Sequence, residues 1–428
     1  MKISWVLLAS GCLAVCGIGN RAACAQDAPA VAAAVALVEK FGGQIERDPQ
    51  GRVVGVNLSG QSLDDAAVKE LAALKDLERL SLRGTGITDA STEHLARLTG
   101  LTSLVIENAT LTDAGVRRFT ATLTKLQTLG LHRMTRMTDA ALKNFKDLPR
   151  LEHLHLTDDY ISDAGLAELA QLHNLRTLDL RGSDMIGDTG CEQLATMTNL
   201  RSLLLRSRGI GDTGVESLAR LTRLRALAVE DSLALTDSGM EWFAKLTELE
   251  ELSVAQAFQV TDAGLKPLAK LTAMRRLNLR RLALDGSGLE HLKDMRELAS
   301  LDLGATPLGD SAIKHVQIFP KLAKLNLTAT TVTDAGIAGL RQLGSLRVLL
   351  LGETRLSDAG AAHLAELTNL AELDLRATPV TDKALPHLLR LTKLKELDVS
   401  KTGLTQEGVA RLRSALPKTR IVAVAATQ

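Results

Sequence analysis

The sequence predicts an α/β solenoid shaped like a horseshoe, with a parallel β-sheet on its concave face, helices on its convex face and about fifteen repeats of 24–25 residues. Three observations support this fold class. A pattern L-x-x-L-x-L recurs every 24 or 25 residues. Its leucines alternate with polar residues, as in a strand with one buried face. A capping residue stands where the helix of each repeat should begin. The pattern begins at Val53, Leu77, Leu101, Leu126, Leu151, Leu175, Leu200, Leu224, Leu249, Met274, Leu298, Leu322, Leu346, Leu370 and Leu394.

One unit, Leu77–Gly100, shows how the sequence specifies each element. Leu80 and Leu82 point to one face of a predicted strand. The segment 84–86 (GTG) turns the chain, and Thr88 opens a helix whose inner side is apolar. Because one unit cannot bury its leucines alone, neighbouring units must stack and share a continuous core.

Residues favoured at helix N-termini fill one position of every repeat. The next residue is Asp in all units except two, where Gly286 and Gln406 replace it. An Asp in the first turn suits the positive end of the helix dipole, so we expect these residues to cap helices rather than to bind calcium or catalyse a reaction. Pro267 and Pro386 lie too deep for an unbroken α-helix, and we expect a 3₁₀-like first turn there. The capping column is Asp64, Thr88, Thr112, Thr138, Ser162, Gly187, Gly211, Thr236, Thr261, Asp285, Gly309, Thr333, Ser357, Thr381 and Thr405.

A second column, of threonines, follows several predicted strands. We expect these hydroxyl groups to bond neighbouring backbone in a stacked ladder. The column comprises Thr85, Thr306, Thr330, Thr354, Thr378 and Thr402.

These motifs resemble leucine-rich repeats of the cysteine-containing, F-box-related (ribonuclease-inhibitor-like) type. They are especially similar to secreted bacterial proteins with the pattern L-x-x-L-x-L-x-x-T-x-(I/V)-T-D-A-G-L, of which Leu322–Ile337 and Leu346–Ala361 are clear copies. The resemblance covers about residues 31–424, and it departs from the family in carrying Thr where Asn or Cys is usual. It implies a curved β/α solenoid with a binding role and no catalytic residues.

Residues 1–25 have the pattern of a cleaved secretory signal peptide. Lys2 precedes an apolar stretch, Ile3–Ile18, and small residues at 23–25 (ACA) form a cleavage site, predicted after Ala25. The alternatives are a buried N-terminal helix and an uncleaved membrane anchor. Lipoprotein anchoring at Cys12 is disfavoured, because too little apolar sequence precedes it. We therefore expect a secreted or periplasmic protein without a membrane span after cleavage.

Cleavage leaves 49 basic and 50 acidic residues, a net charge of −1, and Cys191 as the only cysteine. No intrachain disulfide is then possible, so packing must hold the fold.

We expect a capping helix (30–41) and hairpin strand (44–47) within an N-terminal cap over 26–52. The solenoid covers 53–424, with a closing strand at 420–424 after Pro417, and 425–428 form a tail.

Side chains at the x positions of L-x-x-L-x-L should lie on the concave face, where solenoids usually bind partners. His153 and His155 share one face of a predicted strand, and Asp179 should lie beside His155 on the next strand. No Trp, Tyr or Phe occupies these positions, which is unlike a tight interface built on aromatic anchors. The candidate binding residues are His132, His153, His155, Asp179, Arg181 and Arg206.

We interpret the chain as a non-catalytic scaffold that binds another protein through this face. The alternative is a receptor that uses the same residues for a small ligand, a carbohydrate or a metal such as Zn²⁺. Diagonal neighbours on adjacent strands are ~7–8 Å apart, which disfavours convergence on one ion. The alternative without a binding role is a solvated polar patch with a His155–Asp179 ion pair. We therefore assign no metal and no cofactor.

Other functional classes lack support in the sequence. Neither the P-loop, H-E-x-x-H and G-x-S-x-G motifs nor a nucleophile–base pair can be found, so we do not predict an enzyme. Cys191 falls on the helix side and is expected to be a packing residue. The near-zero net charge and 2% aromatic content disfavour nucleic-acid binding.

Overall fold

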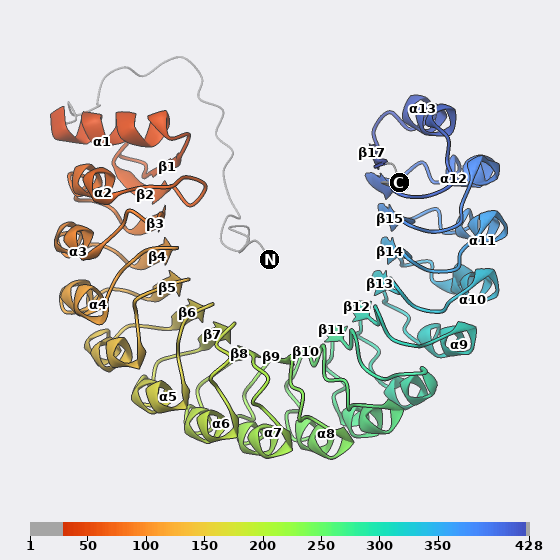
Figure 1. The fold of residues 1–428 in the computed structure, drawn as a ribbon, viewed down its shortest axis with the longest axis horizontal. Helices are drawn as coiled ribbons and strands as arrows, with labels where there is room; N and C mark the ends of the chain where they lie inside the picture. Colours follow the sequence, from red (N-terminus) through yellow and green to blue (C-terminus); the bar gives the residue numbers. More distant parts are fainter. Residues whose placement is uncertain (1–28, 425–428) are drawn as a thin grey trace.

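The computed structural model describes residues 29–424, which form one curved, open solenoid (Figure 1). Strands line the inner face and helices cover the outer face, as the sequence predicts. The curvature follows from spacing, because parallel strands lie ~4.8 Å apart whereas packed helices need about 10 Å. The concave face is therefore a continuous sheet surface.

A single 17-stranded sheet runs through the molecule. Each strand pairs with its neighbour in sequence, in parallel from β2 to β17, and β1 pairs with β2 in the antiparallel direction. The strands are β1 (Gln44–Arg47), β2 (Val53–Asn57), β3 (Arg79–Arg83), β4 (Ser103–Glu107), β5 (Thr128–His132), β6 (His153–Thr157), β7 (Thr177–Arg181), β8 (Ser202–Arg206), β9 (Ala226–Glu230), β10 (Glu251–Ser253), β11 (Arg276–Asn278), β12 (Ser300–Asp302), β13 (Lys324–Asn326), β14 (Val348–Leu350), β15 (Glu372–Asp374), β16 (Glu396–Asp398) and β17 (Arg420–Val422).

Helices of α or 3₁₀ type alternate with these strands. The segment that contains Pro267 is a 3₁₀ helix, and Pro386 follows a short 3₁₀ turn, as expected from the position of each proline. The helices are α1 (Pro29–Lys40), α2 (Asp65–Leu71), α3 (Asp89–Leu95), α4 (Asp113–Thr120), η2 (Asp139–Asp147), α5 (Asp163–Leu169), α6 (Asp188–Leu194), α7 (Asp212–Leu218), α8 (Asp237–Phe243), η3 (Asp262–Lys270), η4 (Ser287–Leu292), η5 (Asp310–Ala312), α9 (Ile313–Val316), α10 (Asp334–Gly339), η6 (Leu340–Gln342), α11 (Asp358–Leu364), η7 (Asp382–Ala384), α12 (Leu385–Leu388) and α13 (Gln406–Ala415).

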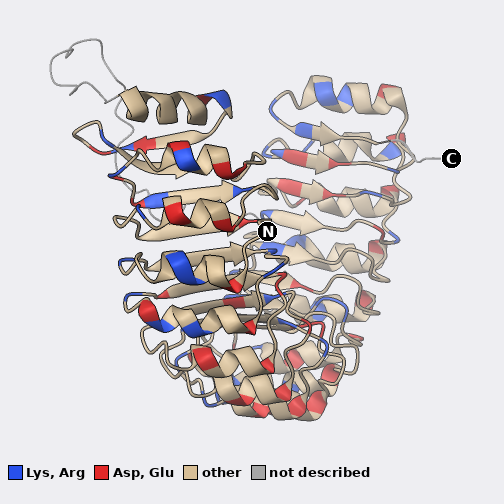
Figure 2. Cartoon of the chain, turned by 60° about the vertical axis from the view of Figure 1, so that its left-hand side comes forward, with Lys and Arg blue, Asp and Glu red and all other residues tan. Residues whose placement is uncertain are grey.

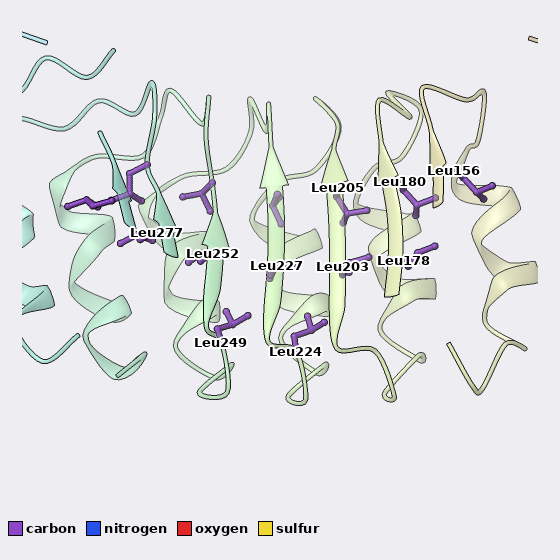
Figure 3. Packing of buried hydrophobic residues seen from close by; sticks show 14 of the residues in the cluster. Leu156, Leu178, Leu180, Leu203, Leu205, Leu224, Leu227, Leu249, Leu252 and Leu277 are labelled. Atoms are coloured by element: carbon purple, nitrogen blue, oxygen red, sulfur yellow. The ribbon is translucent and has the colours of Figure 1, made fainter. Parts of the chain in front are cut away.

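The core lies between the sheet and the helices and repeats unit by unit. Leu178, Leu203 and Leu227 occupy matching positions on neighbouring strands, and all three are buried. Figure 3 shows these leucines side by side in the stacked units. Burial of a leucine side chain contributes roughly 2 kcal/mol, so repetition of this column is the main stabilising contribution.

The Asp that follows each cap binds the next repeat. In one example, the Asp237 carboxylate accepts from the backbone N–H of Thr261 at 2.8 Å and from the Thr261 hydroxyl at 2.6 Å. The sequence predicts only support within the residue's own helix, whereas the structure shows that the same carboxylate also joins two repeats. We call this series the Asp ladder. It comprises Asp65, Asp89, Asp113, Asp139, Asp163, Asp188, Asp212, Asp237, Asp262, Asp310, Asp334, Asp358 and Asp382.

Glycine in the T-D-A-G motif makes room for the Asp ladder. A Cβ placed on Gly264 would lie 2.5 Å from Oδ1 of Asp237, well inside van der Waals contact. The ladder has one gap within residues 29–424, because Gly286 stands where an Asp would reach Gly309. Gly286, with φ of 93°, is itself the N-cap in place of the expected Asp285, whose side chain still accepts from the N–H of Ser287.

The threonine column behaves differently from the expectation. The hydroxyl of Thr306 donates to the carbonyl of Leu303 at 2.6 Å, and Thr330 donates to Leu327 at 2.7 Å. Each bond closes a turn within one repeat rather than a ladder between repeats. Thr85 is exposed instead, beside Gly84. The column therefore fixes the turn that leaves the strand.

Both ends of the solenoid carry covering elements. Val38 of α1 is fully buried at the N-terminal end of the core, and β1 extends the sheet beyond β2. At the other end α13 finishes at Ala415, before Pro417, and β17 pairs with β16. The predicted signal peptide (1–25) and the tail (425–428) lie outside the described residues. No helix in the described part of the chain is long and apolar enough to cross a membrane.

Candidate functional site

The candidate residues lie on four consecutive strands, β5 to β8, on the N-terminal side of the middle of the concave face (Figure 1). The sheet register places His155 between Gly130 of β5 and Asp179 of β7. Alternation puts the leucines between them into the core and leaves the polar side chains on the inner surface. Five residues from three of these strands, β5 to β7, form what we call the histidine patch. They are His132, His153, His155, Asp179 and Arg181.

Asp179 and Arg181 form the fixed centre of the patch. Two guanidinium nitrogens of Arg181 donate to the two Asp179 carboxylate oxygens at 2.9 and 2.6 Å. Asp179 is only 3% exposed. Burial alone would raise the pKa of this carboxyl, but the hydrogen bonds from Arg181 hold the pKa well below its usual value. The pair therefore stays ionised at neutral pH and orients both side chains.

His132 bends back over the sheet because β5 has a glycine beside it. A Cβ on Gly130 would lie 2.9 Å from Nε2 of His132. Nδ1 of the same ring is 2.7 Å from Oγ1 of Thr157, and its centroid is 6.4 Å from that of His155. Burial, and then the neighbouring His155, lower the pKa of His132 and favour the neutral imidazole.

The other two histidines lie along β6. Nδ1 of His153 is 3.0 Å from the hydroxyl of Thr177 on β7. Burial lowers the pKa of His153, and the adjacent His155 lowers it further. Nδ1 of His155 is 3.8 Å from Oδ2 of Asp179, within ion-pair distance but too long for a hydrogen bond. The His155–Asp179 proximity expected from the sequence is therefore present.

The side chain of Arg206 forms ion pairs outside the histidine patch. Its guanidinium is 3.3 Å from Glu230 of β9 and 3.8 Å from Asp231. Its backbone is next to Arg181 in the sheet, yet its side chain turns toward the following repeat. The sequence alone places Arg206 in the same group as Asp179. The structure separates the two residues, because Asp179 binds Arg181 whereas Arg206 lies beside Glu230.

Three residues of this surface escape the sequence reasoning: Thr157, Thr177 and Gly130. The two threonines hold the rings of His132 and His153. A glycine inside a strand indicates close approach by another group, and Gly130 could have been found in this way. The threonines share rows with the histidines across the sheet, so a register drawn from the repeat would have identified them.

The patch offers hydrogen-bonding groups rather than metal ligands. Both oxygens of Asp179 bind Arg181, and Nδ1 of His132 and of His153 binds threonine. Across residues 29–424, no group of three or more His, Cys, Asp or Glu side chains is arranged to hold a metal ion. Nε2 of His132 is buried without a hydrogen-bond partner in the same part of the chain.

Cys191 packs inside the solenoid, as expected. The side chain is fully buried on α6, and this burial raises the pKa of the thiol. A buried, protonated thiol is a poor nucleophile.

Charge over the molecule is mixed. Figure 2 shows basic and acidic residues interspersed on strands and helices. The concave face follows the same rule, since Arg276 pairs with Glu251 and Arg420 with Glu396. A mixed surface suits selection of one partner more than long-range attraction of a charged polymer.

Comparisons with known proteins agree with this architecture. A family model described as a leucine-rich repeat region matches residues 52–284, and a second, described as a leucine rich repeat, matches residues 390–412. No curated protein sequence matches the chain.

Similar solved structures share the fold at low identity. An internalin (InlF) from Listeria monocytogenes is 23% identical, with a TM-score of 0.54 over 85% of this chain and 94% of that one. A chain of the Rad7–Elc1 complex from yeast is 21% identical, with a TM-score of 0.54 over 84% of each chain. A chain of the TLR13–ssRNA13 complex is 18% identical, with a TM-score of 0.53 over 86% of this chain and 66% of that one.

Proposed function

The chain belongs to the leucine-rich repeat family, and from this premise we propose that it is a non-catalytic protein-interaction scaffold that binds through its concave face. Proteins of this family generally act in protein–protein interaction. The observation that carries the proposal is the histidine patch, where an ionised Asp179–Arg181 pair and three imidazoles lie on rigid neighbouring strands. Rigid presentation lowers the entropy cost of binding a partner.

The binding surface is proposed to extend from the histidine patch to Arg206 and Glu230. Arg206 has a side chain that is 45% exposed, so its guanidinium can reach a partner while it stays near Glu230. The surface then combines three imidazoles, one fixed ion pair and one accessible pair. Such a combination favours specificity through matched hydrogen bonds and charges.

Site-specific photocrosslinking tests this proposal. A photoreactive amino acid at His155 should form one discrete crosslinked product with a protein partner in the producing cell. The same group at Ala167, exposed on the helix of the same repeat, is the matched control. A product from Ala167 but not from His155 would contradict concave-face binding. The double variant Arg206→Ala/His155→Ala should remove a wild-type complex without changing the melting temperature.

A second candidate is binding of a small polar ligand by the same patch. The buried, unpartnered Nε2 of His132 supports it, because this atom would gain a hydrogen bond if the groups that cover it moved aside for a ligand. Calorimetric titration with Zn²⁺, simple sugars and short peptides tests this candidate. Saturable heat that disappears in His132→Phe would favour the receptor over the scaffold.

We also propose that the scaffold acts outside the cytoplasm. The N-terminal pattern, with Lys2, the apolar stretch and the small residues before Gln26, supports export. Expression of the full chain with its native N-terminus, followed by N-terminal sequencing of the mature protein, should give Gln26 as the first residue. An intact N-terminus in the cytoplasmic fraction would contradict export.

A further inference from the structure

Most of the strongly exposed large apolar side chains in the described part of the chain lie in loops beside the sheet. Within residues 29–424, four of the five large apolar side chains that are strongly exposed occupy loops that follow a strand: Tyr160, Met185, Leu233 and Phe258. We call these four residues the apolar rim. Since the strands are parallel, all four loops leave the sheet at the same edge.

The apolar rim is local to the central repeats. In two more distant repeats, Thr110 and Thr331 hold the place of Tyr160 and Met185, and their hydroxyls donate to the carbonyls of Ile87 at 3.3 Å and Leu308 at 2.9 Å. Tyr160 and Met185 stand in this place without such a bond, whereas Leu233 and Phe258 come one residue earlier in their loops, and all four side chains are 43–64% exposed. The repeat of β8, which lies between Met185 and Leu233, carries Gly209 in this place. A group of exposed apolar side chains is typical of an interaction surface, particularly where other repeats carry hydrogen-bonding side chains.

The loops that carry the rim are held in place by their neighbours. Met185 forms a β-bridge with Ser162, Ala234 with Gly211 and Gln259 with Thr236. The rim therefore spans four strand spacings, about 20 Å, on a fixed backbone. A surface that is already ordered loses little conformational entropy when a partner binds.

One end of the rim opens into a hollow of about 450 Å³. Arg281 is its only charged lining residue, and its apolar lining comprises Phe258, Leu282, Ala283, Ala305 and Pro307. The Arg281 guanidinium donates to the neutral Gln256 side chain at 2.7 Å. Across the described residues, it has no carboxylate within ion-pair distance. The hollow thus combines an apolar lining with an uncompensated positive charge.

We propose that the apolar rim is a second docking surface, which binds a protein segment carrying a large apolar side chain next to a carboxylate. The apolar side chain fills the hollow beside Phe258, and the carboxylate pairs with Arg281. This surface is separate from the histidine patch, since it uses the loops at the sheet edge and not the strand faces. It supplies the aromatic anchors that the concave face lacks.

Peptide selection on the full-length protein tests the chemistry of the partner. A displayed library of random twelve-residue peptides is selected on the wild-type protein and counter-selected on Phe258→Ser, whose exposed position should leave the melting temperature unchanged. The selected peptides should share a large apolar residue within three positions of Asp or Glu. Absence of selected peptides, or a neutral or basic consensus, would overturn the proposal.

A double-mutant cycle then tests the Arg281 contact. The consensus peptide should bind Arg281→Gln about tenfold more weakly than wild type, and replacement of its acidic residue by the amide should cause a similar loss. The two losses should not add, because they remove the same ion pair. Arg296→Gln, which changes an exposed arginine elsewhere, is the matched control. Additive losses would refute the contact, and a wild-type dimer that Phe258→Ser abolishes in sedimentation would identify a second copy as the occupant instead.

Discussion

At the scale of single residues, Asp159 stands at a position where several other repeats carry a threonine. Its side chain is 3% exposed and occupies the buried place after the strand that Thr306 fills in another repeat. Oδ1 accepts from the N–H of Met134 at 2.6 Å, whereas Oδ2 is buried without a partner. Burial raises the pKa of Asp159 to about 7. A protonated carboxyl can donate a hydrogen bond there, as the threonine hydroxyl does in the other repeats.

Asp159 should make the stability of the protein depend on pH. Because its folded-state pKa exceeds the ordinary value of 3.8, the native protein holds an extra proton between about pH 4 and 7. The free energy of unfolding should therefore fall as pH rises through this window, by up to about 1.4 kcal/mol per pH unit. Denaturant unfolding of wild type and Asp159→Asn at pH 5 and pH 8 measures this effect.

The amide keeps the shape of the protonated carboxyl and cannot ionise, so Asp159→Asn should be more stable than wild type at pH 8 and similar to it at pH 5. Asp184→Asn, an exposed change in the next repeat, is the control. Equal pH dependence in wild type and Asp159→Asn would assign the titration to another group.

At the scale of elements, the sequence predicts strands, turns and caps well but not the bonds between repeats. The periodicity of Leu80 and Leu82 determines which face of a strand is buried. The Asp237–Thr261 bond could not be derived in the same way, because it depends on the spacing between stacked helices. The same limit applies to the candidate site: the His155–Asp179 proximity follows from strand register, whereas Arg206 turns to Glu230 for reasons that only side-chain geometry reveals.

The Asp ladder should contribute measurably to stability. Asp237→Asn weakens one hydrogen bond from Thr261 by removing the charge and places an amide donor opposite the other Thr261 donor, so we expect a loss of about 1–3 kcal/mol in the free energy of unfolding. Asp294→Asn, at an exposed Asp, should be neutral. Thermal and denaturant unfolding of the two variants provide the comparison, and equal stability would show that the ladder is incidental.

Gly264 should tolerate no branched side chain. Gly264→Val would push its Cβ and methyl groups into Asp237 and Met240, and we expect a lower melting temperature and faster hydrogen exchange in η3. Gly344→Val is the matched control, since nothing lies within 4 Å of its Cβ position. Exchange rates in η3 that match wild type would contradict the steric role of the glycine.

At the scale of the whole molecule, the solenoid has two ends and each must be covered. Val38 of α1 seals the N-terminal end against the first repeat, where the side chain of Leu58 also lies. Terminal units of this kind keep the apolar core from contact with water or with another copy. The N-terminal cap was predictable from the sequence, because an apolar helical segment without the L-x-x-L-x-L pattern precedes the first repeat.

The cap can be tested with a single charge. Val38→Asp places an unpaired carboxylate in the sealed end and should unfold α1 and the first repeats, with a loss of several kcal/mol. Size-exclusion chromatography should then show concentration-dependent association through the uncovered end. Ala33→Asp, on the exposed face of the same helix, should remain monomeric and stable. Association of both variants would point to charge on α1 rather than to the lost seal.

The gap in the Asp ladder has a mechanical consequence. A solenoid loaded from its ends carries the same tension through every junction, so it parts where the fewest bonds resist. We expect the junction between η4 and η5 to be that place, because Gly286 leaves Gly309 without the carboxylate hydrogen bond of the Asp ladder. When the two ends of the chain are pulled apart in an optical trap, the first unfolding event should occur at this junction and leave two folded segments, one on either side of residue 300.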